Sequence, residues 1–128
     1  MYEFYFQKLG VWQQSRNLVL RLYQETKSFP DEEKFNLTSQ IRRAVVSIPG
    51  NIAEGIGKSY FKDQARFTSI SYASLMEVLS LLILSQDLGY LNQVTFEDLQ
   101  KEIESIARQL NALRNSQIKL SKSKPPLP

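Results

Sequence analysis

The sequence contains no cysteine and no histidine among its 128 residues. Without cysteine the chain can form no disulfide, no thiolate nucleophile and no cysteine-ligated zinc or iron–sulfur site. Histidine is the most frequent general base and the commonest metal ligand, and helical di-iron sites also require it. These two absences argue against an enzyme, and we expect no catalytic residues, no metal and no cofactor.

Glycine and proline are also scarce, with five of each, and three of the prolines are Pro125, Pro126 and Pro128. The rest of the chain therefore offers long stretches that are compatible with helices. No uninterrupted apolar run approaches the roughly 20 residues that span a bilayer. Residues 1–4 show no basic segment followed by an apolar one, as a secretory signal would. We expect a cytoplasmic protein with no membrane partner.

Apolar residues recur every three or four positions in four segments, which predicts four amphipathic helices. The predicted helices cover residues 9–27, 38–57, 62–88 and 95–120. Thr38 and Thr95 are suitable N-caps, Gly89 is a suitable stop, and Pro49 should kink the second helix without ending it. Short connectors favour an all-α, antiparallel up-down-up-down four-helix bundle. Residues 1–120 form its single domain, and residues 121–128 form a disordered basic, proline-rich tail.

The third predicted helix is apolar on most of its circumference between residues 75 and 84. A lone bundle covers only one side of a helix, so we expect the outer side to contact another subunit. An unusually thick core is the alternative. The candidate oligomer interface consists of Leu75, Val78, Leu82 and Ile83. The predicted core stripe of this helix consists of Phe67, Ile70, Ser74, Glu77, Leu81, Leu84 and Leu88.

Polar residues on the second predicted helix share one face, because Arg43, Ser47, Asn51, Glu54 and Lys58 step by three or four. A buried Glu77 would need pairing, hydrogen bonding or protonation, and the expected partners are Asn51, Arg43 or backbone groups freed near Pro49. The result is either a small functional site or a hydrogen-bond network that fixes the helix register. A magnesium ion held by Glu54 and Glu77 is a further alternative.

The charge distribution points to a polyanionic partner. The formal net charge is +3, and no acidic residue follows Glu104. Basic clusters suit nucleic acid, although they also occur on ordinary solvated helix faces. The candidate nucleic-acid-binding residues are Arg42, Arg43, Lys58, Lys62, Arg66, Lys119, Lys122 and Lys124. The aromatic residues Tyr2, Phe4, Tyr5 and Phe6, with Trp12, either stack bases or cover one end of the bundle.

Several segments together resemble a known family. They are the run Ser47-Ile48-Pro49-Gly50-Asn51-Ile52-Ala53-Glu54-Gly55, the run at residues 37–44, Arg66-Phe67, Ser74-Leu75-x-Glu77 and Leu88-Gly89-Tyr90-Leu91. The chain resembles the "four helix bundle protein" family, also called ribosomal-RNA intervening-sequence proteins, over all but its tail. It departs from the family pattern at Lys58, where arginine is more usual, and at Ala73, where glycine is common.

The resemblance implies a ring-like homopentamer of four-helix bundles. Family genes lie in insertions within large-subunit ribosomal RNA genes or elsewhere in bacterial genomes. A related branch, the accessory variability determinant of diversity-generating retroelements, binds a reverse transcriptase and nucleic acid through a basic surface. The family pattern adds Ser74 to the polar network of Ser47, Asn51, Glu54 and Glu77. Our leading hypothesis is a non-enzymatic, homo-oligomeric accessory protein that binds RNA or DNA; the alternative is a scaffold for a protein partner.

Overall fold

The computed structural model describes residues 1–123, which form four α-helices and three short 3-10 helices, without a strand in that part of the chain. The elements are η1 (Tyr5–Lys8), α1 (Gly10–Glu25), η2 (Thr26–Ser28), η3 (Asp31–Glu33), α2 (Leu37–Ile56), α3 (Phe61–Asp87) and α4 (Gln93–Ser121). The predicted all-α class is therefore confirmed. Lys124 and the three final prolines lie outside the described residues.

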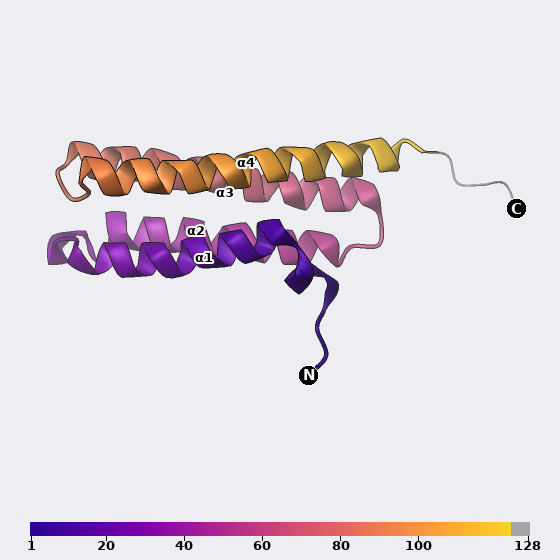
Figure 1. Ribbon diagram of the computed structural model, residues 1–128, viewed down its shortest axis with the longest axis horizontal. Helices are drawn as coiled ribbons and strands as arrows, with labels where there is room; N and C mark the ends of the chain where they lie inside the picture. Colours follow the sequence, from indigo (N-terminus) through magenta and orange to yellow (C-terminus); the bar gives the residue numbers. More distant parts are fainter. Residues whose placement is uncertain (124–128) are drawn as a thin grey trace, which may run out of the picture.

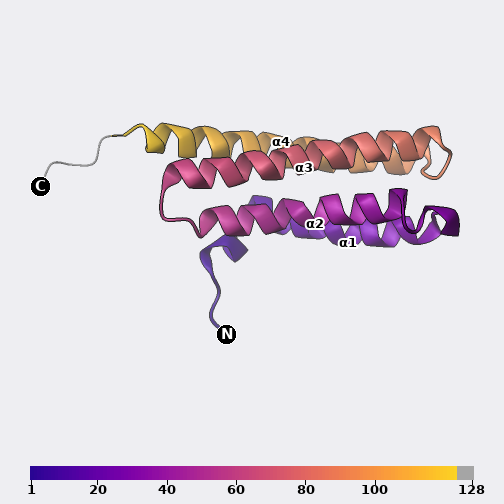
Figure 2. The ribbon, with the colours of Figure 1, turned by 180° about the vertical axis from the view of Figure 1, so that it is seen from behind.

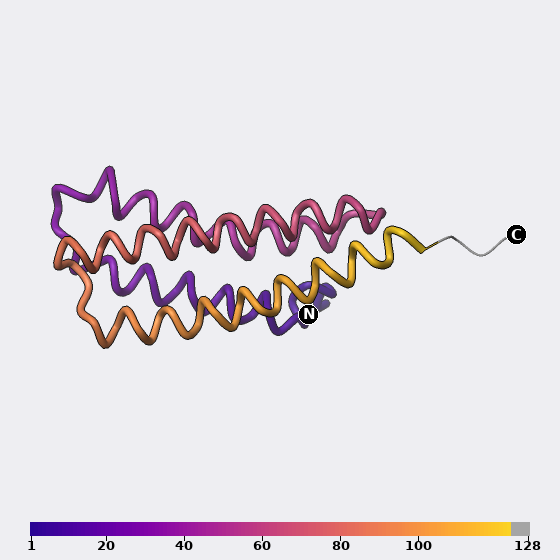
Figure 3. Tube along the Cα trace, turned by 90° about the horizontal axis from the view of Figure 1, so that it is seen from above, coloured from indigo at the N-terminus to yellow at the C-terminus, as the bar shows by residue number. Residues whose placement is uncertain are grey.

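The four helices lie lengthwise beside one another (Figure 1). The connectors between α1 and α2 and between α3 and α4 lie at one end, and the α2–α3 connector lies at the other (Figures 1 and 2). The N-terminal segment lies toward this second end, and the last turns of α4 extend past the α2–α3 connector (Figures 1 and 3). We call this second end the α2–α3 end.

Three of the four helices bury the face on which apolar residues recur every three or four positions. They contribute Val11, Ser15, Leu18 and Leu22 from α1, Ile41, Val45, Ile48 and Ile52 from α2, and Phe96, Leu99, Ile103, Ile106 and Leu110 from α4, all buried. Burying one aliphatic or phenyl side chain of this size stabilises the fold by about 1.5–3 kcal/mol. The apolar periodicity of these three helices therefore matches their buried faces, and Ile56 and Leu113, at the ends of the predicted stripes, are partly buried.

All four helix starts differ from the predicted ones by one or two residues, and the caps of two helices show why. Helix α4 begins at Gln93, because the Asn92 side chain accepts a hydrogen bond from the Thr95 backbone nitrogen at 2.8 Å and caps the helix. Thr95 was predicted to be that cap. Helix α2 begins at Leu37, and Thr38 is buried inside its first turn. Gly89 has a φ of 82°, which favours glycine, and follows the end of α3 as predicted.

The prediction of which face of α3 is buried is wrong. The buried residues of α3 are Ala65, Thr68, Ser71, Leu75, Val78, Leu81, Leu82 and Ser85. Of the predicted interface, Leu75, Val78 and Leu82 therefore belong to the molecule's own core, and only Ile83 is exposed, at 43%. Glu77 is exposed as well, so the prediction that it is buried was also wrong.

Buried hydroxyl groups explain why the wrong face of α3 was predicted to be buried. Ser85 Oγ donates to the Leu81 carbonyl oxygen at 2.7 Å, and Ser71 Oγ donates across the helix interface to the Ile48 carbonyl oxygen at 2.9 Å. A hydroxyl that is satisfied by a backbone carbonyl can be buried at little cost. Serine therefore occupies core positions, and the apolar residues on the outer side of α3 suggested a different face.

By length and composition alone, the 27-residue α3 could cross a bilayer, and it is the one described helix that could. Uninterrupted apolar runs do not reveal this property, because polar residues divide the helix into short apolar stretches. A core helix also passes such a test. Leu75, Val78 and Leu82 are completely or almost completely buried inside the fold, as in a core helix, whereas 33% of the most apolar part of α3 is buried overall.

Candidate functional site

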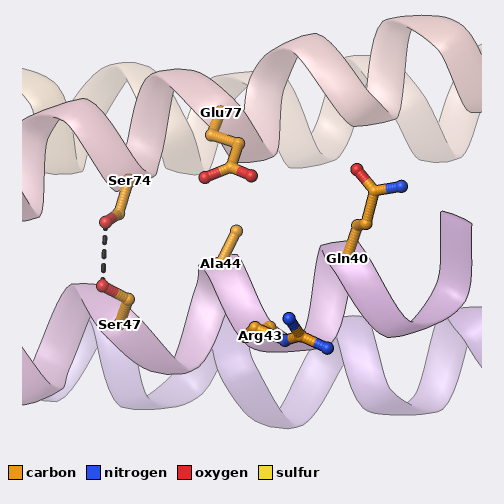
Figure 4. A pocket seen from close by; sticks show the side chains of 6 residues that line it. All are labelled: Gln40, Arg43, Ala44, Ser47, Ser74 and Glu77. Carbon is orange, nitrogen blue, oxygen red and sulfur yellow. Dashed lines mark hydrogen bonds between the residues drawn. The ribbon is translucent and has the colours of Figure 1, made fainter. Parts of the chain in front are cut away.

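Three polar side chains form a network between α2 and α3. The Ser47 and Ser74 hydroxyl oxygens lie 2.8 Å apart (Figure 4). Asn51 Nδ2 donates to the Ser47 carbonyl oxygen at 2.8 Å and to Ser47 Oγ at 2.9 Å. Ser47 and Asn51 are one turn apart on α2, so both side chains reach the same contact with α3. The structure thus brings together three of the five predicted network residues.

The other two network residues lie apart from these bonds. Glu77 points from α3 toward α2 beside an open hollow of about 500 Å³, which Gln40, Arg43, Ala44, Ser47 and Ser74 also line (Figure 4). Arg43 bonds Ser39 Oγ at 3.4 Å rather than Glu77, and Glu54 is exposed. Within residues 1–123, no group of three or more acidic side chains is placed to hold a metal ion.

Two predicted cations converge on one aromatic ring beside the α2–α3 connector. Lys58 Nζ lies 5.0 Å from the centroid of the Phe67 ring, and Arg66 Cζ lies 5.1 Å from it. Such cation–π contacts position each charge while leaving it partly hydrated. Lys62 is exposed one turn before Arg66 on α3. These three cations form a basic cluster at the α2–α3 end, in which the Phe67 ring positions Lys58 and Arg66.

The last turns of α4 bring two more cations to the same end (Figures 1 and 2). Thr68 Oγ1 lies 2.7 Å from Gln117 Oε1, which joins the beginning of α3 to the end of α4. Lys119 is in the last turn of α4, and Lys122 follows the helix. We call Lys58, Lys62, Arg66, Lys119 and Lys122 together the basic end cluster. Its two halves lie more than 50 residues apart in the sequence.

Acidic residues are concentrated at the opposite end. The connector between α1 and α2 contains Asp31, Glu32 and Glu33, and Asp87 ends α3 beside the other connector. Arg21 on α1 contacts Asp98 on α4 at 3.5 Å and Glu102 at 3.2 Å. At this end the carboxylates outnumber Lys27 and Lys34, whereas at the α2–α3 end the basic end cluster outnumbers Glu54 and Asp63, so charge is distributed unevenly along the molecule.

The two remaining predicted cations lie away from the basic end cluster. Arg42 Nε donates to Thr26 Oγ1 at 2.9 Å, its guanidinium also donates to the Tyr23 carbonyl oxygen at 3.2 Å, and Cζ lies 4.6 Å from the Tyr23 ring centroid. Arg42 thus ties the beginning of α2 to the end of α1, where a positive charge suits the helix dipole. Arg43 is exposed beside the hollow that Glu77 lines.

Aromatic side chains are exposed close to the basic end cluster. Tyr2, Phe4 and Tyr5 of the N-terminal segment are 60–76% exposed, Tyr60 is 73% exposed and Phe61 is 43% exposed. Phe6 and Trp12 pack edge-to-face instead, with ring centroids 5.1 Å apart. Tyr60 and Phe61 were not predicted as candidates, although an aromatic pair between Lys58 and Lys62 was a signal in the sequence.

The family model for the 23S rRNA-intervening sequence protein matches residues 7–112. The chain belongs to this family. The match covers all four helices apart from the end of α4, and it confirms the family that the sequence resembled.

A crystal structure from Bacteroides thetaiotaomicron, described as a protein of unknown function from the S23 ribosomal protein family, is similar to this fold with a TM-score of 0.76. The two chains are 23% identical, and the similarity covers 82% of this chain and 95% of the other. No curated protein sequence matches the chain significantly. Neither of the matching descriptions names an enzymatic activity.

Proposed function

We propose that this protein is a non-enzymatic accessory protein that binds RNA or DNA through its α2–α3 end. The supporting observation is that the basic end cluster joins cations from the start of α3 and the end of α4. Lysine and arginine side chains neutralise phosphates and release counterions, which drives sequence-independent binding. Lys62, Arg66, Lys119 and Lys122 are exposed and available for such contacts.

The acidic end supports the same orientation. Asp31, Glu32 and Glu33 would be repelled by a phosphate backbone, whereas the basic end cluster would be attracted. A net charge of only +3 therefore understates the local field at the α2–α3 end. We infer that the molecule meets nucleic acid end-on.

We further propose that each chain is an antiparallel up-down-up-down bundle and that the bundles assemble as a homo-oligomer. The family resemblance implies a ring-like homopentamer. Exposed apolar residues on the outer side of α3, namely Ile70, Ile83, Leu84 and Leu88, supply the interface in place of the three buried residues predicted for it. Basic end clusters repeated on one side of a ring would raise affinity through multivalency.

A protein–protein scaffold is the second candidate function, and the same apolar side of α3 favours it. Ile83 and Leu84 are 43% and 48% exposed, which suits a partner that buries apolar surface. Such a complex would persist at high salt and in the absence of nucleic acid, because apolar contacts are not screened.

The proposed function is tested by titrating labelled structured RNA and duplex DNA across salt concentrations. The test variant combines Lys58→Gln, Lys62→Gln and Lys119→Gln; its control, with the same charge change, combines Lys27→Gln, Lys34→Gln and Lys101→Gln toward the acidic end. We expect the test variant to bind weakly. The slope of the logarithm of its binding constant for duplex DNA against the logarithm of the salt concentration should decrease in magnitude by roughly 0.9 for each phosphate that the protein no longer neutralises. The control should bind like the parent.

Equal losses of affinity in the two triple variants would show that net charge, and not the α2–α3 end, governs binding. No binding of either ligand at low salt would reject the nucleic-acid role and favour the scaffold.

A further inference from the structure

A second hollow opens within the α2–α3 end. Its volume is about 500 Å³, and it lies where the N-terminal segment, the end of α2, the beginning of α3 and the end of α4 meet. Tyr5 and Phe61 contribute aromatic rings to its lining, and Gln64, Ser116 and Gln117 contribute amide and hydroxyl groups. The hollow therefore combines flat apolar surfaces with hydrogen-bonding groups.

The Gln117 amide is only partly satisfied. Its residue is 3% exposed, and its Oε1 atom lies 2.7 Å from Thr68 Oγ1. Its Nε2 atom is buried and has no hydrogen-bond acceptor among residues 1–123. A buried donor without an acceptor is unfavourable, so Gln117 keeps an unused hydrogen-bonding group at the wall of the hollow. Gln64 Nε2 in turn donates to the Lys58 carbonyl oxygen at 2.9 Å, which holds that side chain against the connector.

We propose that this hollow receives an unpaired nucleobase from a single-stranded nucleic acid, an inference that rests on the proposed function. A base offers a π-face for Tyr5 and Phe61 and carries hydrogen-bond acceptors and donors on its edge for the amides. Lys62 and Lys119 belong to the same two helices and are placed for the flanking phosphates. The α2–α3 end thus binds single strands in preference to duplexes.

Two other occupants fit the hollow less well than an unpaired base. A lipid chain would offer no hydrogen-bond partner to the Gln117 amide nitrogen or the Ser116 hydroxyl, which is costly in an apolar contact. A base within a duplex is already paired and stacked, so it enters such a hollow only after it is flipped out. An unpaired base meets neither penalty.

The test compares a single-stranded RNA without self-complementarity with the duplex formed by that strand and its complement. Both are titrated with the parent protein, with a Tyr5→Ala, Phe61→Ala double variant and with a control variant, Phe35→Ala, whose ring is 90% exposed between η3 and α2. We expect the parent to prefer the single strand and the double variant to lose that affinity about tenfold or more, the loss expected for base stacking. The duplex affinity and the control should change little.

A fluorescent aminopurine base in the single strand gives a second measurement that needs no variant. Stacking in the hollow should quench it when the parent protein binds, and the same base within a duplex should show no further quenching. Equal affinity for single strand and duplex, with no effect of the double variant, would overturn the inference and leave the proposed function standing. Failure of both ligands to bind would overturn the two together. If anionic phospholipid vesicles bind and the double variant loses only that binding, the occupant is a lipid surface.

Discussion

At the scale of single residues, Gly55 shows how closely α2 approaches α3. A Cβ atom at this position would lie 2.8 Å from Phe67 Cβ and 3.3 Å from the Gln64 carbonyl oxygen. Phe67 carries the two cation–π contacts of Lys58 and Arg66, so the close approach also positions the basic end cluster. The small residue at position 55 is therefore required by packing and not by an unusual backbone conformation.

We expect Gly55→Ala to destabilise the fold by about 1–3 kcal/mol, because the added methyl group overpacks the contact between the two helices. Gly50→Ala is the matched control, since a Cβ at Gly50 meets nothing within 4 Å. That control should be neutral or stabilise α2 by up to about 1 kcal/mol. Denaturant unfolding of the two variants measures the difference, and equal stabilities would contradict the packing argument.

Tyr90 provides a prediction about pH. Its partial burial, the charges of Glu33 and Glu32, and the hydrogen bond that its hydroxyl donates to Glu33 Oε2 at 3.4 Å together raise the pKa of Tyr90 above 10.0. The folded state therefore holds the phenolic proton more tightly than the unfolded state does. The resulting stabilisation is complete below the unfolded pKa and is lost as the pH rises through the folded pKa. Tyr90→Phe should show a weaker fall in unfolding free energy above pH 10 than the parent, whereas parallel pH curves would contradict the assignment.

At the scale of helices, the sequence predicted α1, α2 and α4 because each has one apolar face and one polar face. It could not predict the orientation of α3. Ile83 and Leu84 are as apolar as Leu82, and a periodicity of three and four fits more than one face of such a helix. Only the packed structure shows that the hydroxyl of Ser71 faces inward and finds its acceptor on α2.

Ser71→Ala tests this account of α3. The variant removes the hydrogen bond to the Ile48 carbonyl oxygen and should cost about 0.5–1.5 kcal/mol of stability. Ser80→Ala is the control, because Ser80 lies on the same helix and is exposed. Alanine has the higher helix propensity, so the control should be neutral or slightly stabilising. Thermal unfolding compares the two, and an equally tolerated Ser71→Ala would show that the cross-helix bond contributes nothing.

At the scale of the whole molecule, the basic end cluster was only partly predictable. Its residues were identified individually as candidates, but the sequence does not say which remote segments meet. Lys58 and Lys119 lie at one end because Gln117, near the end of α4, contacts Thr68, near the beginning of α3. Arg42 had the same sequence signal, yet it contacts Thr26 and Tyr23. The polar network was also only partly predictable. Ser47 and Asn51 share one face of α2, which the sequence shows, whereas the position of Glu77 depends on which face of α3 is buried.

The proposed assembly yields a prediction at this scale. Ile83→Lys places a charge on the outer side of α3 and should lower the mass measured by light scattering if that side forms the oligomer interface. Leu20→Lys is the control, because Leu20 is 62% exposed on α1. The fold of both variants should persist, since neither side chain belongs to the core. An unchanged mass for Ile83→Lys would remove the outer side of α3 as the interface.

Mapping the lysines that RNA protects from chemical acetylation is the most direct test of the central claim, that nucleic acid binds at the α2–α3 end. The charge distribution predicts that bound RNA protects Lys58, Lys62, Lys119 and Lys122. Lys27, Lys34 and Lys101, which are exposed toward the acidic end, should react at the same rate with and without RNA. Protection of these three lysines instead, or equal protection of all lysines, would contradict the claim.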